Sequence, residues 1–156
     1  MRNYKEYIDK NKIALKKAIE IDNNKWEEEN TLENIIEKEK IKVNFERNKA
    51  YLIIYEGQPE ITLQLLEKAI LVNSSIVFTI KDYYLATNKV LISIANKLVQ
   101  ESQKQVLYKL YNNIENEKIY EATQNPDETI YLGNKEDFEY IKNKIHGKVK
   151  FIEYNE

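Results

Sequence analysis

The spacing of apolar residues along this chain changes from a helical period to the shorter period of strands. Charged positions dominate residues 1–40, and the apolar positions among them recur at helical spacing, which predicts a helical N-terminal segment. Trp26 is expected to pin this segment to the rest of the chain. The expected apolar positions of its two helices are Tyr4, Ile8, Ala14 and Ala18, followed by Leu32, Ile35 and Ile36.

Strand patterns begin at Ile41. Residues 41–45 alternate apolar and polar side chains, which predicts a half-buried strand followed by a turn at 46–49. Residues 51–55 form a continuous apolar run, typical of a strand buried on both faces of a parallel sheet. Gly57 and Pro59 end this strand, and Pro59 suits the first turn of a helix. The apolar face expected for that helix consists of Ile61, Leu65, Leu66, Ala69 and Ile70.

The alternation of strand and helix then repeats. Strands are expected at 76–80, 129–132 and 148–152, and the ambiguous stretch 106–111 favours a strand. Helices are expected at 85–100, 115–122 and 135–145. This order predicts an α/β, Rossmann-like fold, with a largely parallel sheet of roughly four or five strands and helices on both faces. The 156 residues are expected to form a single domain, in which the helical segment 1–40 packs alongside the core 41–156.

Composition removes several classes of function. The chain has no cysteine and a single histidine, His146, which excludes disulfides, a cysteine nucleophile and metal sites rich in thiolate or imidazole. With 24 basic and 26 acidic residues, it lacks the basic excess of nucleic-acid-binding proteins. No apolar run approaches the roughly 20 residues of a membrane span, and no signal core follows the N-terminus, so no membrane contact and a cytoplasmic location are expected.

One segment resembles a known family. Residues 53–62, Ile-Ile-Tyr-Glu-Gly-Gln-Pro-Glu-Ile-Thr, are similar to the I-Y-E-A-R-P-x-V-T segment of gamma-glutamyl phosphate reductases, which belong to the aldehyde dehydrogenase superfamily. The resemblance extends over 41–155 and is strongest between Tyr51 and Leu98. It implies the Rossmann-like, NAD(P)-binding domain of that family, without the half that carries the catalytic cysteine. A complete dehydrogenase is therefore not expected, and the chain is not expected to be an enzyme on its own.

The resemblance also implies a location for a cofactor. The candidate NAD(P)-binding residues are Glu56, Pro59, Thr79, Gly133 and Asn134. Thr79 stands where the family has a basic residue, and threonine supplies no charge for a ribose phosphate. Residues 72–74, Val-Asn-Ser, replace the family's Ser-Gly-Asn, and Gly133 serves equally well as an ordinary turn between a strand and a helix.

Acidic residues at the expected helix starts also disfavour a bound dinucleotide. A helix N-terminus attracts phosphate through its free amide groups and its dipole. Here these positions are occupied by carboxylates, while Lys81 and Lys135 offset only part of the negative charge. Asn134 is expected to cap the last helix. The acidic residues in question are Glu60, Asp82, Glu136 and Asp137.

Three hypotheses remain open. In the first, the chain is a degenerate aldehyde-dehydrogenase-like domain that binds no cofactor and acts through contact with a protein partner or as a homo-oligomer. In the second, it is the NAD(P)-binding subunit of a split oxidoreductase whose catalytic half is a separate chain. In the third, it senses a nucleotide or acyl ligand near Glu56, Thr79 and Gly133. His146, beside Gly147, is assigned a structural role at a helix end.

Overall fold

The computed structural model describes residues 3–112, 125–145 and 147–154 of the chain. The helix expected at 115–122 and His146 lie outside the described residues. In chain order the described elements are α1 (Tyr4–Lys10), α2 (Lys12–Trp26), α3 (Leu32–Glu37), β1 (Ala50–Tyr55), α4 (Pro59–Leu71), β2 (Ser75–Ile80), α5 (Leu85–Glu101), β3 (Tyr108–Asn112), β4 (Glu128–Gly133), α7 (Lys135–Ile141), the 3₁₀ turn η1 (Lys142–Lys144) and β5 (Val149–Glu153).

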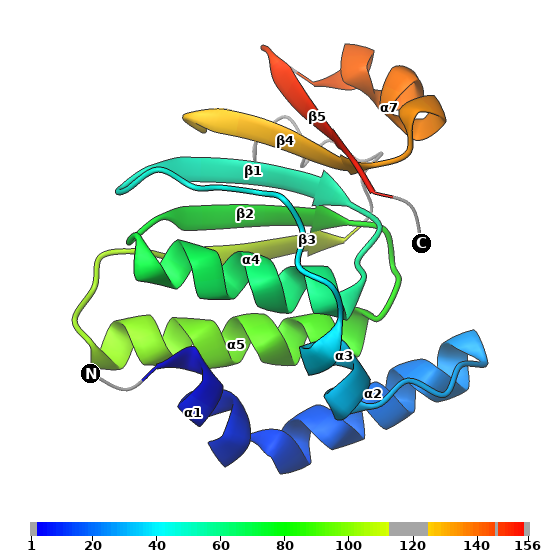
Figure 1. Ribbon diagram of the computed structural model, residues 1–156, viewed down its shortest axis with the longest axis vertical. Coiled ribbons are helices and arrows are strands. Elements are labelled where there is room, and N and C mark those ends of the chain that lie inside the picture. Colours follow the sequence, from blue (N-terminus) through cyan, green and yellow to red (C-terminus); the bar gives the residue numbers. More distant parts are fainter. Residues whose placement is uncertain (1–2, 113–124, 146, 155–156) are drawn as a thin grey trace.

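The five strands form one all-parallel sheet in the order β3-β2-β1-β4-β5 (Figure 1). This confirms the predicted α/β, Rossmann-like fold, including a strand within the ambiguous stretch 106–111. Strands β2 and β3 lie on one side of β1, and β4 and β5 lie on its other side. Right-handed crossovers therefore place α4 and α5 on one face of the sheet and α7 on the other. The strand order reverses between β1 and β4.

The core is built on both faces of β1. Tyr51, Ile53 and Tyr55 point toward α4 and α5 and join the larger buried cluster. Leu52 and Ile54 point the other way, into a smaller cluster that includes side chains of α7. Because β1 is covered on both sides, its uninterrupted apolar sequence is what a central parallel strand requires. The predicted face of α4, namely Ile61, Leu65, Leu66, Ala69 and Ile70, is buried throughout.

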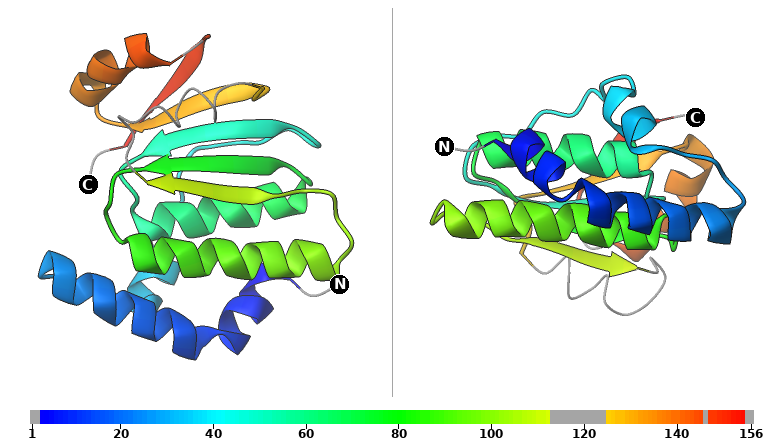
Figure 2. Two further views of the ribbon diagram at one scale, coloured as in Figure 1. Left: turned by 180° about the vertical axis from the view of Figure 1, so that it is seen from behind. Right: turned by 90° about the horizontal axis from the view of Figure 1, so that it is seen from below.

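Helices α1 and α2 pack against α5, α2 runs alongside it, and α3 packs against α4 (Figure 2). The predicted position of Ala14 in the apolar stripe is wrong, because Ala14 is exposed and the buried positions of α2 are taken by Leu15 and Ile19. Trp26 packs edge-on against Tyr83, with 5.3 Å between ring centroids, and so ties the end of α2 to the loop after β2 as expected.

The helix predicted at 135–145 is shorter than expected. It ends at Ile141 and continues as the 3₁₀ turn η1. Its apolar positions are correct nevertheless, since Phe138, Ile141 and Ile145 all pack in the smaller cluster.

The strand predicted at 41–45 is wrong. Residues 41–45 are extended and have the expected alternation, with Ile41 and Val43 buried, but they pair with none of the described strands. Side chains of α4 take the place of a neighbouring strand. The Ile41 amide donates to Gln64 Oε1 at 2.8 Å, and Lys68 Nζ donates to the carbonyl oxygens of Ile41 and Val43 at 2.9 and 2.6 Å. The turn that follows lies at residues 47–48.

Removing the Lys68 ammonium tests whether this tether stabilises the fold. Lys68→Ala deletes two hydrogen bonds from a charged donor to partly buried carbonyl groups, so the free energy of unfolding should fall by about 2 kcal/mol. Lys97→Ala, at an exposed position of α5, is the control and should change it by less than about 0.5 kcal/mol. Urea unfolding followed by circular dichroism measures both. An equal effect of the two substitutions would show that the tether contributes nothing.

Candidate functional site

Four of the five candidate residues lie at the carboxyl edge of the sheet, beside the point where the strand order reverses. Glu56 and Pro59 follow β1, while Gly133 ends β4 and Asn134 follows it. Since β1 and β4 are paired neighbours, the two loops are adjacent. In open α/β sheets, ligands bind in the crevice outside the carboxyl ends of the strands at such a reversal. This edge is therefore the candidate site.

The fifth candidate, Thr79, is separated from this crevice. It lies within β2, flanked by Ile54 of β1 and Tyr111 of β3, and is only 1 % exposed. Its hydroxyl has no hydrogen-bond partner in the described part of the chain. A buried threonine at this place offers a ligand neither positive charge nor access.

The crevice between β1 and β4 is occupied by Tyr131. A Cβ atom built on Gly133 would lie only 2.9 Å from the Tyr131 hydroxyl oxygen, so the glycine makes room for a tyrosine of its own strand. Burial, assisted by the charges of Asp137 and Glu56, raises the pKa of Tyr131 to about 12. The phenol is therefore neutral at physiological pH and lies in a negative environment.

The start of α7 is capped by its own N-cap side chain, which binds one first-turn amide group. The Asn134 side chain accepts a hydrogen bond from the Asp137 amide at 2.8 Å and donates one to Asp137 Oδ2 at 2.9 Å. This confirms the predicted cap, with Glu136 and Asp137 in the first turn. The arrangement stabilises a short helix and directs carboxylates toward the crevice.

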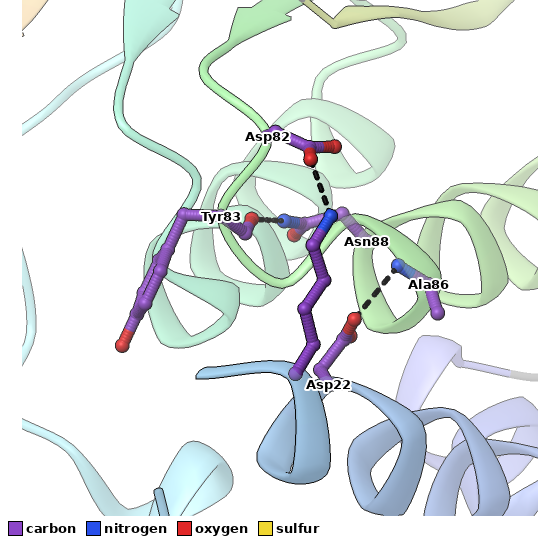
Figure 3. A network of polar contacts seen from close by, with 6 residues as sticks. Asp22, Asp82, Tyr83, Ala86 and Asn88 are labelled. Atoms are coloured by element: carbon purple, nitrogen blue, oxygen red, sulfur yellow. Dashed lines mark hydrogen bonds and ion pairs between the residues drawn. The ribbon is translucent and has the colours of Figure 1, made fainter. Parts of the chain in front are cut away.

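The start of α5 is capped by Asp22, which comes from α2 (Figure 3). Asp22 is 2 % exposed and accepts hydrogen bonds from the Thr87 amide at 2.7 Å, the Thr87 hydroxyl at 2.6 Å and the Ala86 amide at 3.3 Å. The prediction that Asp82 serves this helix start is wrong. The first turn of α5 contains no acidic residue, and Asp82 forms an ion pair with Lys25 instead.

A second contact fixes α2 beside Asp22. The Tyr84 hydroxyl donates to Asn23 Oδ1, which also accepts a hydrogen bond from the Asn30 amide at 3.1 Å. The Asn23 amide nitrogen donates in turn to the Asn30 carbonyl oxygen at 2.9 Å. Tyr84 itself has a left-handed backbone conformation at φ 51°, which turns the chain into α5. The end of α2, the following loop and the start of α5 thus form one connected unit.

Asn88 joins the loops after β1 and β2. Its Nδ2 atom donates to the carbonyl oxygens of Gly57 at 2.7 Å and Tyr83 at 3.2 Å, and its Oδ1 atom accepts from the Thr62 hydroxyl at 2.5 Å. Thr62 also contacts the Tyr55 hydroxyl, whose pKa is raised by burial. The two loops approach each other closely, since a Cβ atom built on Gly57 would lie 2.6 Å from the main-chain carbonyl oxygen of Tyr83. These groups satisfy one another and leave no room for a ligand between the loops.

A pocket of about 680 Å³ opens at the carboxyl edge, and its charge is negative. Four glutamates and one lysine are among its lining residues, which include Tyr83 and Tyr154. The Tyr83 hydroxyl lies within hydrogen-bonding distance of both Glu28 oxygens, at 2.6 and 2.8 Å. Glu60, in the first turn of α4, is 7 % exposed. The charged residues of the lining are Glu28, Glu29, Glu37, Lys38 and Glu60.

Neither a metal cluster nor a membrane span is present in the described ranges. No three histidine, cysteine, aspartate or glutamate side chains there are placed to hold a metal ion. No helix there has the length and the apolar character needed to cross a bilayer.

Asp22 and Asn88 are the functional-site residues that the sequence analysis missed. Asp22 carried a signal, because it falls seven residues after Leu15 on the buried stripe of α2 that also holds Ala18 and Ile19. A carboxylate on an apolar stripe must find donors in another element. The sequence signal for Asn88 was weaker: it is an asparagine inside a helix that is otherwise rich in apolar residues.

No protein-family model and no curated protein matches this chain. The resemblance to gamma-glutamyl phosphate reductases therefore stays a prediction from residues 53–62.

Replacing Asp22 tests the importance of the α5 cap. Asp22→Ala leaves two backbone amides and a buried hydroxyl without their acceptor, so the free energy of unfolding should fall by about 3 kcal/mol. Asp22→Asn keeps one acceptor oxygen and should lose roughly half as much. Asp9→Ala, on the exposed side of α1, is the control and should change stability by less than about 0.5 kcal/mol. A loss for Asp22→Ala no larger than the control's would contradict the assignment.

Proposed function

We propose that this chain is a non-catalytic, aldehyde-dehydrogenase-like domain that acts through protein contacts rather than through a bound dinucleotide. The observation that carries the proposal is the buried Asp22 carboxylate on the N-terminus of α5. In a dinucleotide-binding fold, a helix start at this edge offers free amide groups to phosphate. Here the amides of Ala86 and Thr87 already donate to a carboxylate of the same chain.

The charge distribution supports the same proposal. Glu60 lies in the first turn of α4, and Asp137 lies in the first turn of α7. Together with Asp22, they place a carboxylate at the start of each of the described helices that follow β1, β2 and β4, namely α4, α5 and α7. A pyrophosphate entering this edge would be repelled at all three helix starts. The Nζ atom of Lys81, which follows β2, lies 3.9 Å from Glu56 Oε1, so the two charges offset each other.

One observation favours the alternative, an NAD(P)-binding subunit of a split oxidoreductase. The strand order reverses between β1 and β4, which is the place where dinucleotides bind in sheets of this order. For that function Tyr131, which lies beside Gly133, would have to move out of the crevice.

Calorimetric titration with NADH and NADPH distinguishes the two functions. We expect no saturable heat up to millimolar cofactor, because Asp22 already binds the amides at the start of α5, and Glu60 and Asp137 place negative charge in the first turns of α4 and α7. One-site binding with a micromolar dissociation constant would contradict the proposal.

If binding is seen, a matched pair of charge reversals locates it. Glu56→Arg changes the charge at the crevice, whereas Glu20→Arg makes the same change on an exposed position of α2. Binding in the crevice predicts a change of affinity for Glu56→Arg alone. Equal affinities of both variants would place the cofactor elsewhere and leave the crevice unused.

A further inference from the structure

The tethered segment, residues 38–45, has one satisfied edge and one open edge. On the side of α4, the main chain of Glu39, Ile41 and Val43 is bound by the side chains of Gln64 and Lys68. In an extended chain, neighbouring residues direct their N–H and C=O groups to opposite edges. The main-chain groups of Lys40 and Lys42 therefore point away from α4.

These groups have no partner within the described structure. None of the hydrogen bonds among the described residues involves the main chain of Lys40 or Lys42. Unpaired main-chain donors and acceptors along an extended segment form a template for another strand. The edge of the tethered segment has this property although the segment itself belongs to no sheet.

A groove runs beside this edge. It has a volume of about 580 Å³, with residues 38–42 on one side and the ends of β4 and β5 on the other. In Figure 1, α4 and α5 lie together on the side of β2 and β3, and no described helix of this layer reaches β4 and β5. The apolar side chains of the groove are Ile41, Leu132, Ile152 and Tyr154.

The charges of the groove favour an acidic occupant. Three lysines line it, Lys38, Lys40 and Lys42, against the two glutamates Glu39 and Glu153. None of the ion pairs within the described residues involves these lysines. Burial raises the pKa of the Glu67 carboxyl group of α4, and Lys40 also lies close enough for its charge to lower this pKa in part.

We propose that this groove binds an extended segment of a partner protein, which adds as a strand to the open edge of Lys40 and Lys42. Successive side chains of a strand point to opposite faces, so the bound segment alternates two kinds of residue. Apolar side chains face Leu132 and Ile152, and acidic side chains lie beside Lys38 and Lys42. The inference rests on the proposed contact function and names its surface and the chemistry of its partner.

The test uses the full chain and a short peptide that alternates valine and glutamate. Fluorescence anisotropy of the labelled peptide measures affinity, and amide chemical shifts of the ¹⁵N-labelled protein locate the binding. We expect saturable binding, with the largest shifts at Lys40, Lys42 and Ile152. A peptide of the same composition without the alternation, and one with lysine in place of glutamate, should each bind at least about tenfold more weakly.

Two changes isolate the main-chain contacts. A peptide N-methylated on the amides of one edge cannot donate there, and Lys42→Pro removes a donor from the protein that the fold itself does not use. Each should weaken binding about tenfold. Lys42→Ala is the matched control, because it removes the side-chain charge but keeps the amide group. The N-methylated peptide leaves the protein unchanged, so this comparison stands even if Lys42→Pro unfolds.

Several outcomes would overturn the inference. No binding at millimolar peptide would do so, as would binding that N-methylation leaves unchanged. Sedimentation velocity is run alongside, and self-association lost in Lys42→Pro would show that a second copy of this chain occupies the groove instead. Cofactor titration is independent of all these measurements. A failed peptide test with no NADH binding would therefore reject the groove while keeping the contact function.

Discussion

The position of one carboxylate governs how the N-terminal helices and the sheet become a single structure. Helix α5 begins at the carboxyl edge of the sheet with amide groups that need acceptors, and its own first turn contains no acid. Asp22 supplies the acceptor from α2, 65 residues earlier in the chain than Thr87. Because the carboxylate is buried, it is stable there only while those donors remain in place. The cap and the docking of α2 therefore depend on each other.

The same contact has a consequence for function. A parallel sheet directs its helix N-termini to one edge, and the fold leaves open what will satisfy them. A phosphate, a water molecule or a carboxylate of the chain can each accept hydrogen bonds from these amide groups. In this protein the chain's own side chains serve at α5 and α7, and Glu60 adds negative charge at α4. At α5 the amide groups that could bind an anion instead bind Asp22, and this contact attaches α2 to α5.

The sequence predicted the parts of the fold that depend on local pattern. The apolar side chains of residues 51–55 point to both faces of the strand and need burial on both, so this run identified the central strand. Pro59 identified the start of the helix that follows. Two errors share a physical cause. Residues 41–45 have the alternation of a strand, but the pattern reports only burial on one face and cannot show that Gln64 and Lys68 replace a strand. Asp82 lies close in sequence to the start of α5, but the amide groups there donate to Asp22, which is distant in sequence. Sequence proximity alone could not show this.

The tethered segment and the capped helix starts are two answers to the same requirement, that main-chain groups near a core find partners. At the carboxyl edge the side chains of Asp22 and Asn134 meet this requirement at the starts of α5 and α7. Along residues 38–45 the side chains of α4 can reach only one edge of an extended chain, because its main-chain groups alternate in direction. Lys68 spans two carbonyl groups, yet no side chain of α4 can reach the groups of Lys40 and Lys42, which point the other way. A segment held by side chains on one edge therefore keeps its other edge open, and here that edge lies beside the face of β4 and β5 that no described helix covers.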